Sequence, residues 1–192
     1  MHAAIDAVTT LTARRQAHHG PDAPTGGPSL SILPALRTLI VGCADPRVDP
    51  VFVLRLQPGE AAVLRNVGGR ITPGAEQELA LLQEVARAHG ARPGVRFDLI
   101  VLHHTDCGIA ALQGRPDQLA GYFGVDAAAL PAKAVGDPRA AVAVDVARLR
   151  ADPRLPRDWV VSGLVYDVHA GRVEVVVPPE HDPEPHASGG AS

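Results

Sequence analysis

The chain has 192 residues, 46% of them hydrophobic, and a formal net charge of −3. This length and composition predict one soluble domain with a single substantial core. The small net charge and the lack of a lysine and arginine run argue against a nucleic-acid partner. The first 20 residues show no apolar run of the kind a secretory signal needs, and no segment approaches the roughly 18 apolar residues of a membrane span. We therefore expect a cytoplasmic protein without a membrane partner.

The two ends of the chain differ in composition from its middle. Residues 1–19 are predicted to form an N-terminal arm helix, because apolar residues recur there at roughly helical spacing. Glycine and proline crowd the following stretch, so 20–35 is predicted to be a linker. Residues 36–177 are predicted to form the folded domain. The tail 178–192, rich in proline, histidine, glycine and serine, is predicted to be disordered.

Strand-like and helix-like segments alternate through the folded domain. Apolar β-branched runs predict strands at 36–42, at 60–69 with a glycine-rich turn, at 96–104, and two more within 159–177 folded about "HAGR". Leucine and valine at helical spacing predict helices at 74–90 and 138–151. The expected fold is α/β: a mostly parallel β-sheet flanked by helices, with the C-terminal strands extending the sheet.

Each of the two cysteines follows a predicted strand. Cys43 comes after 36–42 and Cys107 after 96–104, at the sheet edge where open α/β folds bind ligands. In a reducing compartment, two cysteines are expected to be free, metal-bound or catalytic rather than joined in a structural disulfide. Two thiolates and one imidazole form a donor set that suits zinc. Three protein ligands would leave the fourth tetrahedral position vacant, as in catalytic zinc sites.

His104 is the predicted imidazole ligand. The His-x-x-Cys spacing of His104 and Cys107 lets both side chains close on one ion across a strand-to-helix turn. Because side chains alternate along a strand, His103 is predicted to point elsewhere, in a supporting or sheet-packing role. For an isolated His-x-x-Cys, the alternative is a polar residue at a strand end followed by a small buried thiol. Cys43 and its neighbours favour the metal site.

The neighbourhood of Cys43 reads "CADPRVDP" over residues 43–50. Arg47 can pair with Asp45 in a bidentate contact that holds the carboxylate ionised and aimed at the site. The alternative is a surface pair that stabilises the turn and contributes little. A cysteine phosphatase loop is excluded, because there the cysteine and arginine enclose five residues whereas Cys43 and Arg47 enclose three.

Three motifs, taken together and in this order, point to a known family. "CADPR" at 43–47, "RNVGG" at 65–69 and "HTDCG" at 104–108 closely resemble the motifs of the β-class carbonic anhydrases, and the likeness runs from about residue 36 to 177. The plant-type branch carries a glutamine before the first cysteine, whereas "GGPSLSILPALR" contains none. The resemblance is therefore to the smaller bacterial branch.

The resemblance implies a zinc site of Cys43, His104 and Cys107 with a catalytic dyad of Asp45 and Arg47 beside it. It further implies that the arginine and asparagine of "RNVGG" shape the pocket loop. It also implies a homodimer or an assembly of dimers, with the active site near the subunit interface and the arm helix embracing the partner.

The implied activity is the zinc-dependent reversible hydration of carbon dioxide to bicarbonate and a proton, by attack of zinc-bound hydroxide. Asp45, kept anionic by Arg47, would orient the attacking oxygen. Two alternatives stay open: a carbonyl sulfide or carbon disulfide hydrolase on the same scaffold, and a non-catalytic zinc-stabilised module that Asp45 closes as fourth ligand. We also expect low pH to favour a closed state in which Asp45 leaves Arg47 for the metal.

Overall fold

The computed structural model describes residues 7–18 and 30–180. The chain divides into two compact units, residues 1–30 and 31–192. The described helix of the first unit is α1 (Ala7–His18), which falls inside the range predicted for the arm helix. Of the predicted linker 20–35 and tail 178–192, only residues 30–35 and 178–180 belong to the described part of the chain.

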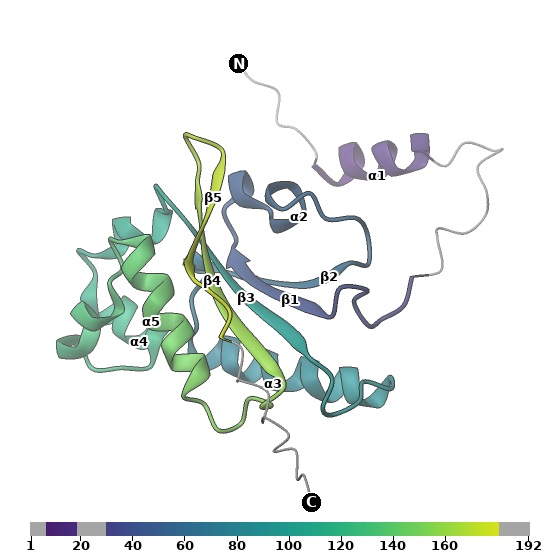
Figure 1. The fold of residues 1–192 in the computed structure, drawn as a ribbon. Coiled ribbons are helices and arrows are strands. Elements are labelled where there is room, and N and C mark those ends of the chain that lie inside the picture. Colours follow the sequence, from purple (N-terminus) through teal and green to yellow (C-terminus); the bar gives the residue numbers. More distant parts are fainter. Residues whose placement is uncertain (1–6, 19–29, 181–192) are drawn as a thin grey trace, which may run out of the picture. The chain divides into compact units, whose positions relative to one another are not determined.

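The second unit is built on a five-stranded sheet of order β2-β1-β3-β4-β5 (Figure 1). Parallel pairing joins its first four strands, which are β1 (Thr38–Cys43), β2 (Ala61–Asn66), β3 (Phe97–His104) and β4 (Trp159–Asp167). The last strand, β5 (Arg172–Val177), returns antiparallel beside β4. The predicted mostly parallel sheet, extended by the C-terminal strands, is confirmed.

Two long helices cover one face of this sheet. Helix α3 (Pro73–Ala88) starts after Thr72, whose hydroxyl accepts the Ala75 N–H, and α5 (Pro138–Arg150) starts after Asp137. Since side chains alternate along a strand, odd-numbered strand residues form the core with these helices. The buried members are Leu39, Val41, Leu99, Val101, Val161 and Val165 from strands, and Leu79, Val142, Val146 and Leu149 from helices.

Several short elements that the sequence did not predict connect the strands. They are η1 (Pro46–Val48), α2 (Pro50–Val53), η2 (Val67–Gly69), η3 (Gly108–Leu112), α4 (Pro116–Phe123) and η4 (Ala127–Lys133). One or two turns are too short to show helical periodicity, although α4 carries a proline at its start and ends at Gly124 with φ 63°. None of the helices described is long and apolar enough to cross a membrane.

Candidate metal centre

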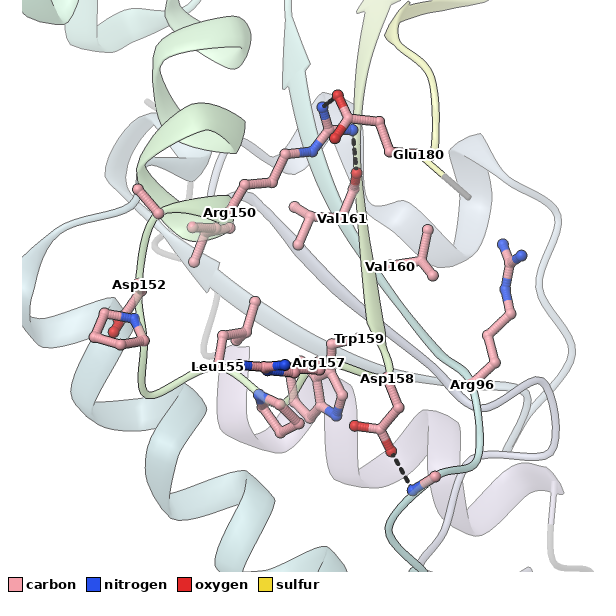
Figure 2. A pocket seen from close by; sticks show the side chains of 15 residues that line it. Arg96, Arg150, Asp152, Leu155, Arg157, Asp158, Trp159, Val160, Val161 and Glu180 are labelled. Carbon is pink, nitrogen blue, oxygen red and sulfur yellow. Dashed lines mark hydrogen bonds and ion pairs between the residues drawn. The ribbon is translucent and has the colours of Figure 1, made fainter. Parts of the chain in front are cut away.

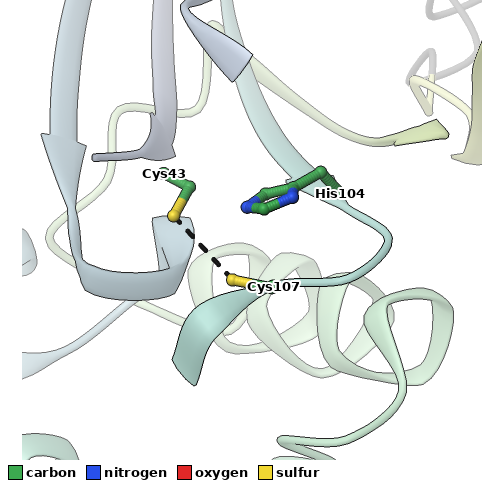
Figure 3. A group of neighbouring side chains, drawn as sticks. All are labelled: Cys43, His104 and Cys107. Atoms are coloured by element: carbon green, nitrogen blue, oxygen red, sulfur yellow. Dashed lines mark hydrogen bonds between the residues drawn. The ribbon is translucent and has the colours of Figure 1, made fainter. Parts of the chain in front are cut away.

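Three side chains converge at the carboxyl edge of the sheet (Figure 3). Cys43 is the last residue of β1 and His104 the last residue of β3, and these strands are neighbours. Cys107 follows β3 after Asp106, whose φ of 54° turns the chain back toward the strand end. The two sulfurs lie 3.8 Å apart, and each residue offers a ligand atom within 4.8 Å of the others. The sequence therefore identified the three residues that the fold brings together.

The hydrogen bonds of His104 fix which ring nitrogen is available. Nδ1 lies 2.8 Å from the Thr105 carbonyl oxygen, so Nδ1 carries the hydrogen and donates it. Nε2 then holds the lone pair. It is buried and has no hydrogen-bond partner within the described chain, and its electrostatic partner is the Cys43 sulfur. Burial alone would lower the pKa of His104, but the neighbouring Cys43 sulfur raises it.

A hydrogen bond couples the two thiols. The hydrogen bond from the Cys107 thiol lowers the pKa of Cys43, and the same bond raises the pKa of Cys107. The Asp45 N–H also donates to the Cys43 sulfur at 3.4 Å. Both cysteines are free, and their separation is far beyond the about 2.05 Å of a disulfide.

Asp45 lies beside the cluster and commits its carboxylate to Arg47. Arg47 Nη2 donates to Oδ2 at 2.7 Å, Arg47 Nε donates to Oδ1 at 3.1 Å, and the Arg47 backbone N–H donates to Oδ1 at 2.9 Å. Arg47 lowers the pKa of Asp45 to about 2 through these bonds. On its other side, Arg47 Nη1 donates to Asp106 Oδ2 at 2.8 Å. The convergent donor group found among the described residues does not include Asp45.

Arg65 clamps the loop that carries Cys43 and Asp45. Its Nε donates to the Cys43 carbonyl at 2.9 Å and its Nη2 donates to the Asp45 carbonyl at 2.7 Å. Its Nη1 pairs with Asp49 at 2.8 Å. The following residue, Asn66, bonds the backbone of Arg70 and so closes the glycine loop.

His103 points to the face of the sheet that α5 covers, as the strand alternation predicted. Its Nε2 lies 3.1 Å from the Gly69 carbonyl oxygen and 3.3 Å from Asp145 Oδ2. Asp145 and its partner Arg70 were not singled out from the sequence. The available signal was a lone aspartate in the apolar run "AAVAVDVARL" of a buried helix.

A larger cleft, of about 760 Å³, lies elsewhere, at the amino edge of the sheet (Figure 2). Several of its charged groups bond to one another and to the backbone. Arg150 pairs with Glu180 and donates to the Val161 carbonyl oxygen, and Asp158 accepts the Gly94 N–H. The convergent, unsatisfied donor atoms belong to the carboxyl edge, where a second cavity of about 140 Å³ is lined by His104 and Cys107.

The three side chains fit a tetrahedral zinc ion. Two sulfurs bound at about 2.3 Å and at a tetrahedral angle lie about 3.8 Å apart, which matches the distance between Cys43 and Cys107. An ion at this place would also use the buried lone pair of His104 Nε2. Fold and site together define a class: an α/β protein with a candidate two-thiolate, one-imidazole metal centre at the carboxyl edge of its sheet.

Comparison with known proteins specifies the class further. The family model described as carbonic anhydrase matches residues 38–124. "Beta-carbonic anhydrase 1" of Mycobacterium tuberculosis is 30% identical over 151 residues, which cover 78% of this chain and 87% of that protein. The solved carbonic anhydrase of Streptococcus mutans superposes with a TM-score of 0.65 at 30% identity, over 91% of this chain and 99% of the other.

A relative with a different name is also similar. The "carbon disulfide hydrolase" of an Acidianus strain is 27% identical over 166 residues, which cover 71% of this chain and 76% of that protein. The Mycobacterium protein is more identical to this chain than the Acidianus protein, and its match covers more of the chain. The chain belongs to the β-carbonic anhydrase family.

Proposed function

We propose that this chain catalyses the reversible hydration of carbon dioxide to bicarbonate and a proton, with a zinc ion held by Cys43, His104 and Cys107. The observation that carries the proposal is the convergence of two sulfurs 3.8 Å apart with an unpartnered buried imidazole nitrogen, beside a carboxylate held by arginine. A zinc ion bound there supplies a Lewis acid that makes water a nucleophile at neutral pH.

Asp45 orients the attacking oxygen in this proposal. A carboxylate has about four lone-pair sites, so hydrogen bonds from Arg47 leave Asp45 able to accept one more. Arg47 fixes the plane of the carboxylate through two guanidinium nitrogens and keeps it ionised. An ionised Asp45 accepts a hydrogen bond from the attacking oxygen and turns its lone pair toward the substrate carbon. Arg65 supports this role by holding the carbonyl groups of Cys43 and Asp45.

The same geometry argues against a permanently closed, non-catalytic site. Closure needs the Asp45 carboxylate at the metal, whereas both of its oxygens bond Arg47. Arg47 in turn is held by Asp106 through its side chain and its backbone carbonyl. The Arg47 guanidinium thus has three hydrogen-bond partners that hold it in place, and it keeps the Asp45 carboxylate away from the position of a fourth metal ligand.

Stopped-flow hydration of carbon dioxide at pH 7 and pH 8.5, on protein assayed for zinc in the same sample, tests the proposal. We expect about one zinc per chain and activity that rises with pH. Full zinc content with no hydration at either pH would refute carbon dioxide as the substrate. Turnover of carbon disulfide or carbonyl sulfide by that sample would then assign the hydrolase activity.

We also propose that two copies of the chain form a homodimer through the β2 edge of the sheet. β2 is an outermost strand, so one row of its backbone groups is open to pairing. Val63 on this strand is 37% exposed, and Phe52 on α2 is 74% exposed with Val51 beside it at 48%. Exposed apolar side chains next to an open strand edge are features of an association surface. Assemblies larger than a dimer, and the cytoplasmic location, stay predictions from the sequence.

A further inference from the structure

A buried ion network lies next to the candidate metal centre, and the mechanism above does not use it. Arg70 and Asp145 are each 1% exposed, and Arg70 Nε donates to Asp145 Oδ2 at 2.7 Å. His103, 2% exposed, brings its Nε2 to 3.3 Å from the same oxygen. Buried charges cost free energy unless they are paired and hydrogen-bonded, so a network here calls for a physical reason.

The network has a definite protonation pattern. Burial alone would raise the pKa of Asp145, but hydrogen bonds from His103 and Arg70 lower it, so the carboxylate is ionised. The backbone N–H of Ile71 adds a further donor at 3.2 Å. Both groups that His103 Nε2 faces, Asp145 Oδ2 and the Gly69 carbonyl, are acceptors. His103 Nε2 therefore carries a hydrogen and donates it.

Side chains from three elements hold the backbone carbonyl groups of the glycine loop 67–70. Burial raises the pKa of Tyr122 to about 12, so its hydroxyl keeps its hydrogen at neutral pH and donates it. Tyr122 donates to the Val67 carbonyl at 2.7 Å, and His103 donates to the Gly69 carbonyl at 3.1 Å. Asn66 donates to the Arg70 carbonyl at 2.8 Å. The loop is thus fixed on both sides of Gly68.

The loop lies directly against the first metal-binding candidate. Gly68 and Gly69 have φ values of 80° and 66°, which glycine adopts readily. A side-chain carbon at Gly69 would lie 2.9 Å from the Cys43 backbone nitrogen, so the two segments are in close contact. The Gly68 backbone also contributes to lowering the pKa of the Cys43 thiol. Any shift of this loop therefore changes the surroundings of that sulfur.

We propose that His103 and Asp145 are positioning residues of the metal centre: they hold the glycine loop 67–70 in its close contact with the backbone of Cys43. Asp145 acts through His103 and Arg70. Groups packed around a metal ligand orient it and tune the metal affinity. The expected effects on zinc and cobalt binding rest on the proposed zinc site, whereas the restraint on the loop does not depend on a metal.

Two substitutions at one position test the restraint. His103→Leu removes the donor and keeps apolar bulk, whereas His103→Gln can place an amide N–H near the position of the imidazole Nε2. Val161→Ala, in the same core but without a contact to the loop, controls for lost stability. We expect His103→Leu to lower zinc affinity about 10–100-fold and to shift the sulfur-to-metal charge-transfer band of the cobalt-loaded protein. His103→Gln should restore most of the zinc affinity and most of the position of the charge-transfer band.

Amide hydrogen exchange on the metal-free protein gives a readout that needs no metal. The Gly68 and Gly69 amides should exchange faster in His103→Leu than in the wild type or in Val161→Ala. Tyr122→Phe, which frees the Val67 carbonyl at the other side of Gly68, should act in the same direction and serves if His103→Leu does not fold. Equal behaviour of the Leu and Gln variants, or unchanged exchange in Tyr122→Phe and His103→Leu, would overturn the proposal. A wild type that binds no zinc would instead refute the proposed function.

Discussion

Asp45 is the residue whose surroundings decide how the candidate centre works. Its side chain is 14% exposed, and three nitrogens of Arg47 reach it. Because it does not belong to the convergent donor group of the described residues, its loss should leave metal binding in place. This separates a role in orienting the attacking oxygen from a role in holding the ion.

Asp45→Asn should therefore lower kcat for carbon dioxide hydration by about 100-fold or more while zinc stays near one per chain. The physical reason is that an amide is neutral and presents an N–H to Arg47, so its orientation is lost. Asp106→Asn is the matched control, since Asp106 binds the same guanidinium from a more exposed position. It should change kcat only a few-fold. Loss of zinc from Asp45→Asn would contradict the assignment and favour Asp45 as a ligand.

The titration of Asp45 gives a second prediction at this scale. A folded-state pKa of about 2 lies below the ordinary value near 3.9. Stability contributed by the ion pair is thus complete above about pH 4 and is lost as pH falls toward 2. Carbon-detected NMR of the Asp45 carboxyl should show a midpoint near 2, and Arg47→Gln should move it toward 4. A midpoint above 4 in the wild type would contradict the pairing.

This titration bears on the predicted closed state. Asp45 is ionised from pH 8 down to pH 5, so closure over that range cannot depend on its protonation. Closure would require Arg47 to release an ionised carboxylate, and the hydrogen bond between Arg47 and Asp106 would also have to break or rearrange. The low-pH closure stays a prediction.

At the scale of elements, the glycine loop between β2 and α3 is a connection that tolerates little substitution. Gly69 combines a left-handed φ of 66° with a position where a side-chain carbon would lie 2.9 Å from the Cys43 nitrogen. Both the backbone conformation and the contact exclude a larger residue. The loop can therefore approach the strand end only as glycine.

Gly69→Ala should reduce the free energy of unfolding by about 2–4 kcal/mol, from left-handed strain and overpacking together. Gly121→Ala is its control. Gly121 lies inside α4, where an added side-chain carbon meets nothing within 4 Å. That variant should be neutral or more stable by about 0.5–1 kcal/mol, because alanine favours a helix. Urea denaturation of both metal-free variants measures the difference, and equal stabilities would refute the close approach.

The elements that the sequence predicted are those with long periodic patterns. The strand pair within 159–177 and the helices near 74–90 and 138–151 lie within a residue or two of the structure. The three donor residues were also predictable, because Cys43, His104 and Cys107 stand where parallel strands end. Neither periodicity nor spacing reveals a contact between distant buried polar groups. The bond between Arg70 and Asp145 joins residues 75 positions apart, and only the folded chain shows it.

At the scale of the whole molecule, the two edges of the sheet differ in a way that bears on assembly. The β2 edge is open, with apolar side chains exposed on it and on α2. The opposite edge is β5, where Val175 is 58% exposed but Glu174 pairs with Arg139. Charged side chains on an edge strand oppose pairing with another strand. The difference favours β2 as the dimer edge.

Phe52→Lys should therefore raise the dimer dissociation constant by about 100-fold, because a charge replaces the most exposed aromatic side chain of this surface. Val175→Lys places the same charge on the opposite edge and should leave the dimer intact. Sedimentation velocity across a concentration series distinguishes the two variants. If Val175→Lys dissociates the protein and Phe52→Lys does not, the interface lies at β5. Zinc content is then measured on the same samples. Because Cys43, His104 and Cys107 converge within a single chain, each metal centre should be complete in one chain and the dissociated protein should keep its zinc.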